Sequence, residues 1–502
     1  MSLREWAVLL AIIAVSLAIV AGNTYLPMND ASSHLATGLI AYRLLQGDAF
    51  TAAHYRFDAL PLPYWGTTLG LLPLIPVLGP FAALHALLAI YIVALPASFY
   101  FLCRTAAPDN VRLTPVAALA VFNWAYWRGE IHTLLAQPLI LLGLALFLRI
   151  RRLRSPEGIG FLAVCVGMYL CHVFAVVTLL IVVGTLAGLD LARQRVRGLE
   201  AQRLVPGQWA AAGCVVALVA LAAYYVLLQH GSGANQGSVR FSLSPWKLAY
   251  FMGVQPLGSP ADSNRFDLDA ALTLGFAGLL AALLLLPRVR GVRLPLLAPA
   301  LALAAIVYFG PLSVETPGGA EHIGLRFVST GFLLALVAVR LTPLSRTAGW
   351  VLMAGILVFS AFKLGEAWSA HRAADEVFGR LSRNLLATIP ERSRVLPIKD
   401  LPKQRSGRAA RMIHRLVNYV VIERESYSPH VFAATGQQPL RHVRWGDHRD
   451  VNDRSVSEDE WAYYDYVLVQ TDQPQLDIAG LAARAALVGF EDGFQLYRIR
   501  GR

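Results

Sequence analysis

Apolar runs recur along the first three quarters of this sequence, from residue 5 to about residue 368. Each run is about 20 residues long, and a helix of about 20 residues crosses the ~30 Å hydrocarbon core of a bilayer. Of the 502 residues, 56% are hydrophobic and 15% are charged, whereas an ordinary globular protein has roughly 25% charged residues. A soluble fold cannot bury that much apolar surface, so the pattern predicts a polytopic membrane protein.

The runs predict about eleven membrane-spanning helices, which form an all-α bundle over residues 1–368. Their ranges are 5–21, 81–103, 112–127, 133–150, 158–171, 173–190, 208–228, 269–287, 294–310, 327–341 and 347–364. The first run ends without a small-residue cleavage site, so we interpret it as a membrane helix and not as a cleaved signal peptide. The apolar segment 67–80 is broken by three prolines, and we predict that it does not span.

The positive charge of the chain follows the topology that these spans imply. The net charge is +12, but the basic residues lie mainly in short loops between apolar runs, which argues against a nucleic-acid partner. Arginine-rich loops at 149–154, 193–203 and 288–293 are expected in the cytoplasm, together with the N-terminus. The outer face then receives loops 22–66, 128–132, 229–268 and 311–326. For a bacterium, this predicts an inner-membrane protein.

The tail, residues 369–502, is predicted to be a soluble α/β domain on the same outer side, the periplasm. Strand-like stretches at 393–398, 466–469 and 494–498 alternate with helical stretches at 371–388, 406–424 and 478–487. Such alternation is typical of a small α/β fold.

The first outer loop places an acidic side chain at the start of a helix. Asn29 and Asp30 precede a helical pattern over 35–45, and either side chain can cap the exposed N–H groups of its first turn. The helix dipole stabilises a carboxylate there, and His34 lies one turn on, on the same face. This is the pattern of a capped amphipathic helix, or of an acid and an imidazole held together for catalysis at the membrane surface.

Asp30, the helix after it and the Leu-Leu-x-Gly-Asp sequence that ends this helix resemble the start of the GT-C superfamily. These are polytopic glycosyltransferases that use polyprenyl-phosphate sugars, such as the aminoarabinose and protein O-mannosyl transferases. The resemblance extends to the predicted topology of the whole chain. It implies that Asp30 is the general base on the acceptor nucleophile. Family members more often carry a paired acidic dipeptide, where this chain has Asn29 before Asp30.

The short outer turn 128–132 carries Glu130 and His132. An interfacial aromatic belt with a surface ion pair between Arg128 and Glu130 explains this turn about as well as a catalytic or binding site does. The GT-C resemblance places a second acidic residue in this region, so Glu130 is a catalytic candidate that assists Asp30 or orients a metal. His132 is the weaker candidate, for substrate binding.

His172 lies at the outer turn of a predicted tight hairpin. An ionisable side chain at membrane depth is costly and usually faces a cavity or a partner. The residue is therefore a structural histidine or a substrate-binding one. With His34, His54, His132 and His322 it forms a set of outer-face imidazoles that is compatible with a divalent metal, although their spacing is not diagnostic and no cofactor is required.

Arg326 stands at the outer start of a predicted helix, against the positive-inside trend, and is expected to have an anionic partner. That partner is Glu315 or Glu321 in a purely structural interpretation. Alternatively, the guanidinium binds the phosphate of the lipid donor. GT-C enzymes often place a basic residue near this position. Arg56 is a further phosphate-binding candidate, or a solvated surface charge.

These residues support the hypothesis of an enzyme that moves a sugar from a polyprenyl-phosphate donor to a glycan, lipid or protein acceptor in the envelope. A lipid-linked-saccharide transporter or flippase is one alternative, and it would carry ionisable residues near the midplane and internal repeats. A noncatalytic polysaccharide-assembly protein is another, and it would not need Asp30.

Overall fold

A computed structural model describes residues 1–58, 63–196, 203–230, 238–241, 243, 247, 273–276, 278, 289–315, 323–341, 346–400, 416–431, 439–444, 455–471, 478 and 480–501. Two compact units divide the chain. Unit 1 consists of Met1–Ile19 and Leu88–Trp368, and unit 2 consists of Val20–Leu87 and Ser369–Arg502. The first predicted outer loop therefore belongs to the same compact unit as the C-terminal segment.

Six helices among the described residues are long and apolar enough to cross a membrane. They are α1 (Leu3–Ala21), α6 (Pro80–Ala106), α9 (Ile131–Arg149), α11 (Val173–Arg195), α12 (Pro206–His230) and α17 (Arg346–Asn384). Three shorter apolar helices accompany them, namely α10 (Pro156–Cys171), α15 (Leu294–Phe309) and α16 (Leu325–Ala338). The count of about eleven spans is not confirmed, and the predicted span at 269–287 lies largely outside the described residues.

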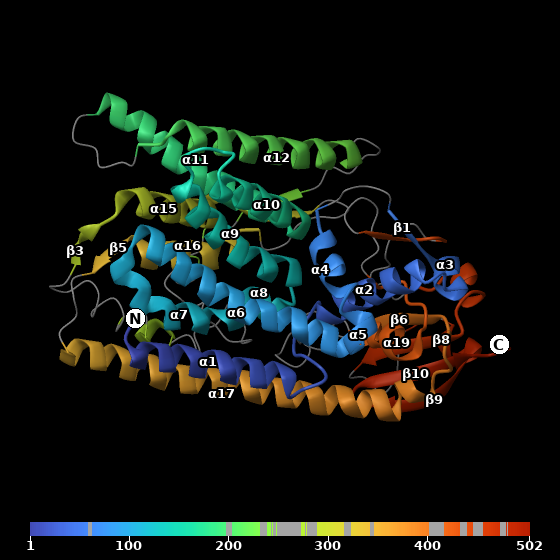
Figure 1. Cartoon of the computed structure of the whole chain (residues 1–502). Helices are drawn as coiled ribbons and strands as arrows, with labels where there is room; N and C mark the ends of the chain where they lie inside the picture. The colour runs from blue at the N-terminus through green and yellow to red at the C-terminus, as the bar shows by residue number, and fades with distance from the viewer. Residues whose placement is uncertain are drawn as a thin grey trace. The chain divides into compact units, whose positions relative to one another are not determined.

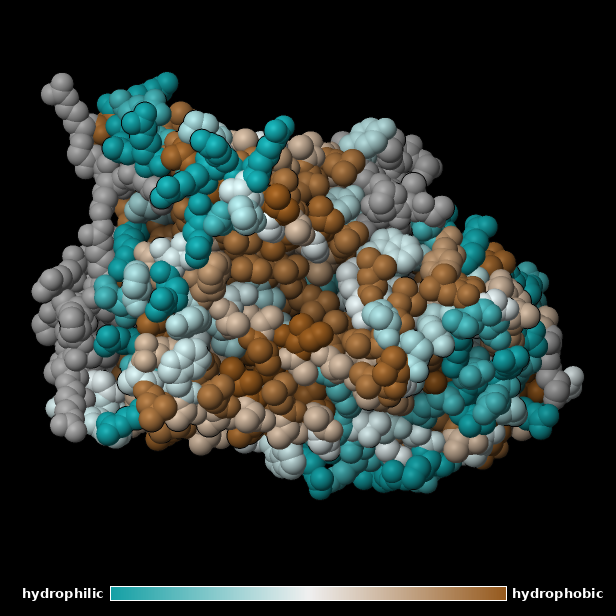
Figure 2. Space-filling view, viewed as in Figure 1, coloured by the Kyte–Doolittle hydropathy of each residue, from teal (hydrophilic) through white to brown (hydrophobic). Residues whose placement is uncertain are grey.

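Helix packing in unit 1 follows the apolar faces of these helices. Helix α10 packs against α9, α11 and α12, and α15 packs against α16 and α11 (Figure 1). Apolar side chains gather over these helices on the face shown in Figure 2. Two short strand pairs also occur in unit 1, β2 (Ser238–Phe241) with β4 (Pro311–Glu315) and β3 (Val289–Val292) with β5 (Val339–Leu341).

The predicted helix at 112–127 is wrong, because this segment is broken into short pieces. They are η1 (Pro108–Leu113), α7 (Thr114–Leu119), η2 (Ala120–Phe122) and α8 (Trp124–Arg128). Asn123 is extended, and its side chain accepts from the N–H of Tyr126, which starts α8 as a new helix. Its Nδ2 donates to Tyr91 Oη at 3.1 Å and to Gln137 Oε1 at 2.9 Å, so buried polar groups of α6 and α9 meet at the break.

The segment between 65 and 78 also forms short helices, α4 (Trp65–Leu71) and α5 (Ile75–Leu78). Neither is long enough to cross a bilayer by itself, as the prolines predicted. In unit 2, α2 (Ala31–Leu45) and α3 (Ala49–His54) follow the start of the first loop. The short strand β1 (Tyr55–Phe57) pairs antiparallel with β7 (Leu440–His442), which joins this loop to the C-terminal segment.

Unit 2 also contains a four-stranded sheet in the order β6-β8-β10-β9. Strands β6 (Val395–Asp400), β8 (Tyr466–Thr471) and β10 (Phe494–Ile499) confirm the three predicted strands. The predicted helix at 371–388 corresponds to the end of α17, up to residue 384, followed by η4 (Leu386–Thr388). The described end of the predicted helix at 406–424 consists of η5 (Leu416–Asn418) and α19 (Tyr419–Arg424).

One strand of this sheet was missed. The predicted helix at 478–487 holds only for α21 (Leu481–Arg484), because β9 (Ala485–Glu491) begins directly after it. Strand β9 pairs antiparallel with β10 through a tight turn at Asp492 and Gly493, which have φ of 46° and 81°. An Asp-Gly pair between apolar stretches is a strong hairpin signal, so the sequence does carry the evidence for β9.

Candidate functional site

Glu130 lies in the turn that connects α8 to α9. Gly129 ends α8 with a φ of 75°, a conformation that glycine adopts without strain, and Glu130 occupies the N-cap position of α9. Its Oε2 accepts a hydrogen bond from Thr133 Oγ1 at 3.0 Å, one turn into the helix. The carboxylate is thus held at the N-terminal end of α9 instead of pointing freely into solvent.

His172 lies between α10 and α11, as the predicted hairpin required. The residue is only 4% exposed, and its Nδ1 accepts from the backbone N–H of Phe174 at 3.1 Å, which caps the start of α11. A neutral imidazole has one protonated nitrogen. Because Nδ1 accepts here, the proton of neutral His172 belongs on Nε2.

Arg326, the second residue of α16, meets both of these side chains. Its Nη2 lies 3.3 Å from Glu130 Oε1, and its Nη1 contacts His172 Nε2. The guanidinium carbon lies 5.4 Å from the centre of the Phe174 ring. The side chains of Glu130 and Arg326 are 12% and 15% exposed, so the pair is largely screened from solvent.

Three elements of unit 1 therefore bring together three predicted site residues, Glu130, His172 and Arg326. The anionic partner of Arg326 in this structure is Glu130, a pairing that was not predicted. Phe174 and Thr133 were missed as members of this cluster. Thr133 was recognisable in principle, because a threonine three residues after an N-cap acid lies on the same helical face.

Asp30 belongs to unit 2, at the N-cap position of α2. The predicted capping bond is wrong: Asp30 has φ −103° and ψ 0°, and its side chain makes no capping hydrogen bond to α2. Instead, its Oδ1 accepts from Asn29 Nδ2 at 2.9 Å. His34 follows one turn later and is buried.

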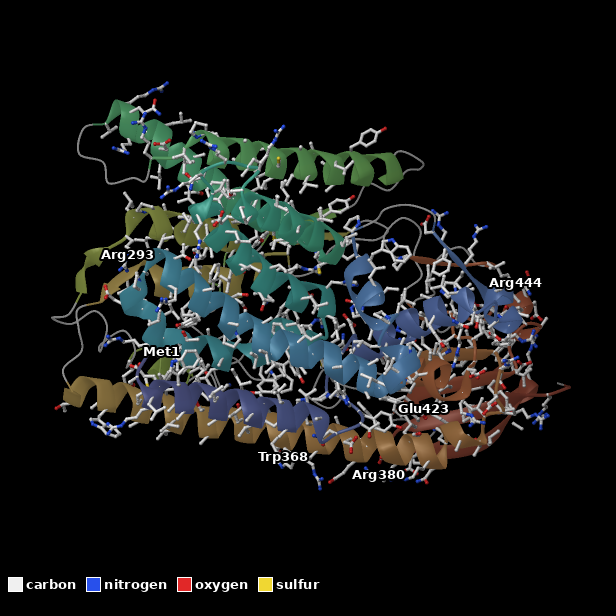
Figure 3. All side chains as sticks on the ribbon, in the orientation of Figure 1. Met1, Arg293, Trp368, Arg380, Glu423 and Arg444 are labelled. Atoms are coloured by element: carbon white, nitrogen blue, oxygen red, sulfur yellow. The ribbon has the colours of Figure 1, made fainter. Side chains whose placement is uncertain are left out.

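Several contacts within unit 2 hold the segment that carries Asp30. Tyr25 donates from its hydroxyl to Glu423 Oε1 at 2.7 Å, and its backbone N–H donates to Asp375 Oδ1 at 2.9 Å. Glu423, on α19, is labelled in Figure 3. Ser33, in the first turn of α2, accepts from Asn418 Nδ2 at 2.6 Å. The position of Asp30 thus depends on residues between 375 and 423, which are far from it in the sequence.

The remaining candidates are placed as follows. Arg56 is exposed on β1, opposite Arg441 of β7. His132 is buried in the first turn of α9. His322 lies outside the described residues, as does most of the loop 229–268. No group of three or more histidine, cysteine or acidic side chains among the described residues has the arrangement of a metal site.

His54 and Lys247 have structural partners in this fold. His54 Nδ1 donates to the carbonyl of Phe50 at 2.7 Å, and its ring stacks on Tyr427 with centroids 4.7 Å apart. Lys247 donates to the carbonyl of Tyr308 at 3.3 Å, at the C-terminal end of α15.

Comparison with known proteins finds matches among solved structures alone. No protein-family model and no curated protein sequence matches the chain. A structure of ArnT from Cupriavidus metallidurans bound to undecaprenyl phosphate has 13% identity and a TM-score of 0.49, and the match covers 98% of this chain and 97% of that one. The arabinofuranosyltransferase AftD from Mycobacteria has 15% identity and a TM-score of 0.45, over 100% of this chain and 40% of that one.

Both likenesses run along nearly the whole of this chain. Because both TM-scores lie below 0.5, the comparisons assign neither an activity nor a substrate to it.

Proposed function

We propose that this chain is an integral membrane glycosyltransferase of the GT-C type. It transfers a sugar from a polyprenyl-phosphate donor to a glycan, lipid or protein acceptor on the outer face of a bacterial inner membrane. Residues 369–502 form its periplasmic domain. The observation that carries this proposal is the cluster of Glu130, His172 and Arg326, which comes from three separate elements and is largely buried.

The hydrogen-bonding groups of this cluster favour an anionic ligand. Neutral His172 carries its proton on Nε2, because Nδ1 accepts from Phe174, and Nε2 faces the guanidinium of Arg326. Two donors therefore face one another, and a phosphate oxygen that accepts from both of them would relieve this conflict. In the proposed reaction, Arg326 and His172 stabilise the phosphate as it leaves, and Glu130 orients Arg326.

Asp30 is proposed as the general base. Its carboxylate stands at the start of α2 and is oriented by the hydrogen bond from Asn29 Nδ2, and an oriented carboxylate can take a proton from a substrate nucleophile. His34, Arg56, His132 and His322 remain substrate-binding candidates.

Two variants test the proposal in membranes that contain the full-length protein. Asp30→Asn and Arg326→Ala are each expected to lower the rate of glycan formation by about 100-fold or more, while the lipid-linked sugar accumulates. Mass spectrometry of the lipid and glycan fractions measures both quantities.

Asp48→Asn is the matched control for Asp30→Asn. Asp48 lies in the same loop and caps α3 by accepting from Thr51 N at 2.8 Å, a role that asparagine also performs well. This variant is expected to form glycan product at the normal rate. Normal product from Asp30→Asn would eliminate Asp30 as the base, and unchanged lipid-linked sugar levels in both variants would favour a noncatalytic role.

A further inference from the structure

Asn29 stands beside the proposed base in a defined orientation. Its Nδ2 donates to Asp30 Oδ1 at 2.9 Å, and the residue is only 7% exposed. An ionised carboxylate accepts hydrogen bonds and cannot donate them, so the amide of Asn29 must turn its NH₂ group toward Asp30. The assignment of nitrogen and oxygen in this side chain therefore follows from its neighbour, and Oδ1 is directed away from that contact.

The Oδ1 atom of Asn29 is buried and has no hydrogen-bond partner within the part of the chain that the structure describes. Buried polar atoms in proteins almost always have a partner, because desolvating an acceptor without replacing its bond to water is unfavourable. An orphaned acceptor beside the proposed base offers a position at which a donor from outside the chain can bind.

Other buried asparagines show why Asn29 is different. Among the described residues, the Oδ1 atoms of Asn23, Asn110 and Asn418 are also buried and accept no hydrogen bond. The Nδ2 of Asn110 donates to carbonyls at the end of α16, and that of Asn418 donates to Ser33, so both join parts of the scaffold. The Nδ2 of Asn29 instead holds the carboxylate to which the proposed chemistry is assigned.

We propose that Asn29 and Asp30 together bind the acceptor substrate through two neighbouring donor groups, of which adjacent hydroxyls of a sugar are the fitting chemistry. This inference rests on the proposed function. One hydroxyl donates to Asn29 Oδ1, and the neighbouring hydroxyl, the nucleophile, donates to Asp30. The acceptor is thereby oriented by a residue that takes no proton itself.

The transfer step balances with these groups alone. The nucleophilic hydroxyl gives its proton to the Asp30 carboxylate, and its oxygen forms the bond to the anomeric carbon of the donor sugar. The bond from that carbon to the phosphate oxygen breaks, and the lipid phosphate leaves with the electron pair.

The charge of the pair also selects the acceptor. Asn29 and Asp30 together carry one negative charge, and both present hydrogen-bond acceptors to the substrate. A phosphate or carboxylate nucleophile would place further acceptors against them and would be repelled by Asp30. The pair therefore fits a neutral hydroxyl-bearing acceptor.

A deoxygenation experiment tests this arrangement. The full-length protein, in membranes that supply its lipid-linked donor, is given octyl glycosides as acceptor probes, each paired with analogues in which one hydroxyl is replaced by hydrogen. For the wild-type protein, removing the hydroxyl next to the nucleophile is expected to lower kcat/KM about tenfold, the effect of one hydrogen bond.

Two substitutions of Asn29 then separate contact from scaffolding. For Asn29→Ala, kcat/KM with the complete glycoside is expected to fall about tenfold. The deoxy analogue is expected to cause no further fall in kcat/KM, because the substitution and the deoxygenation remove the same hydrogen bond. Asn29→Asp keeps an acceptor oxygen in a side chain of the same shape. This variant is expected to transfer the sugar more slowly, but its kcat/KM is still expected to fall about tenfold when the acceptor hydroxyl is removed. The KM for the lipid donor is expected to stay unchanged in both.

Asn110→Ala serves as the folding control, because Asn110 has the same kind of buried Oδ1 but belongs to unit 1. Lower thermal stability and unchanged deoxy sensitivity are expected. If Asn29→Ala responds to deoxygenation as the wild type does, a buried water satisfies Oδ1 and the inference is overturned. Transfer to the endogenous membrane acceptor but to no glycoside would also overturn it, and would leave the proposed function intact. A wild-type protein that consumes no lipid-linked sugar with any acceptor would overturn the proposed function itself.

Discussion

Removing one partner of the Glu130–Arg326 pair is expected to destabilise unit 1 strongly. In Arg326→Gln, the Glu130 carboxylate remains with only 12% of its side chain exposed and without its cation. Breaking a fully buried ion pair in this way costs about 3–5 kcal/mol. Because both side chains retain some exposure and Thr133 still donates to Glu130, we expect a loss of about 2–4 kcal/mol in the free energy of unfolding.

The double variant Glu130→Gln/Arg326→Gln removes both charges and leaves two amides that can bond to each other. Its loss is expected to be about 1 kcal/mol, well below the sum of the two single losses. Equilibrium unfolding in detergent micelles, followed by tryptophan fluorescence, provides the four free energies of this cycle.

Glu458→Gln provides a control at an exposed ion pair. Glu458 accepts from Arg484 at 2.5 and 2.7 Å on the surface of unit 2, and its removal is expected to leave stability unchanged within error. If the single losses at Glu130 and Arg326 add within about 0.5 kcal/mol, the two side chains are not coupled, and the cluster on which the proposed function rests does not exist in solution.

Two further substitutions test other parts of the fold. Asn110→Ala removes the donor to the carbonyls of Leu336 and Val339, at 2.8 and 2.7 Å, and is expected to lower the free energy of unfolding by about 1–3 kcal/mol. Arg293 also donates to the carbonyl of Val339, and an unchanged free energy of unfolding would show that Arg293 alone is enough to hold this end of α16. Burial lowers the pKa of His54, so the folded state disfavours protonation of this side chain. Neutral His54 therefore contributes stability at pH values above its ordinary pKa of about 6.5, and this contribution is lost as the pH falls below that value. The melting temperature of His54→Gln is therefore expected to fall less than that of the wild type between pH 7 and pH 5, and equal slopes would contradict this assignment.

Much of the fold follows from local properties of the sequence. The transfer free energy of an apolar run is a sum over its own residues, and all six long apolar helices correspond to predicted spans. The three predicted strand-like stretches form three of the four strands of the sheet in unit 2. Even the missed strand β9 has a local signal in Asp492 and Gly493.

The break at Asn123 shows where local reasoning stops. The run 112–127 is apolar enough to predict a helix, but an interrupted helix needs partners for its freed backbone and polar groups. Here Tyr91 and Gln137, from α6 and α9, meet the side chain of Asn123, and Tyr91 donates to the carbonyl of Val121. No property of the run itself reveals that those partners are present.

The candidate site divides in the same way. The sequence by itself determined which ionisable residues stand near helix ends, because a charge inside an apolar run is unfavourable and marks either a turn or a function. It also identified Asp30 at the start of a helix. It left open whether Arg326 pairs with a neighbouring acid, and whether Asn29 or Asp30 caps α2.

Only the tertiary structure decided these points. Arg326 pairs with Glu130 and contacts His172 because the starts of α9, α11 and α16 meet, and such a meeting depends on how whole helices pack, not on the residues next to each side chain. Asn29 turns its amide toward Asp30 and leaves a buried oxygen without a partner. Helix propensity and capping rules describe one helix at a time, whereas hydrogen-bond satisfaction is a property of the folded chain as a whole.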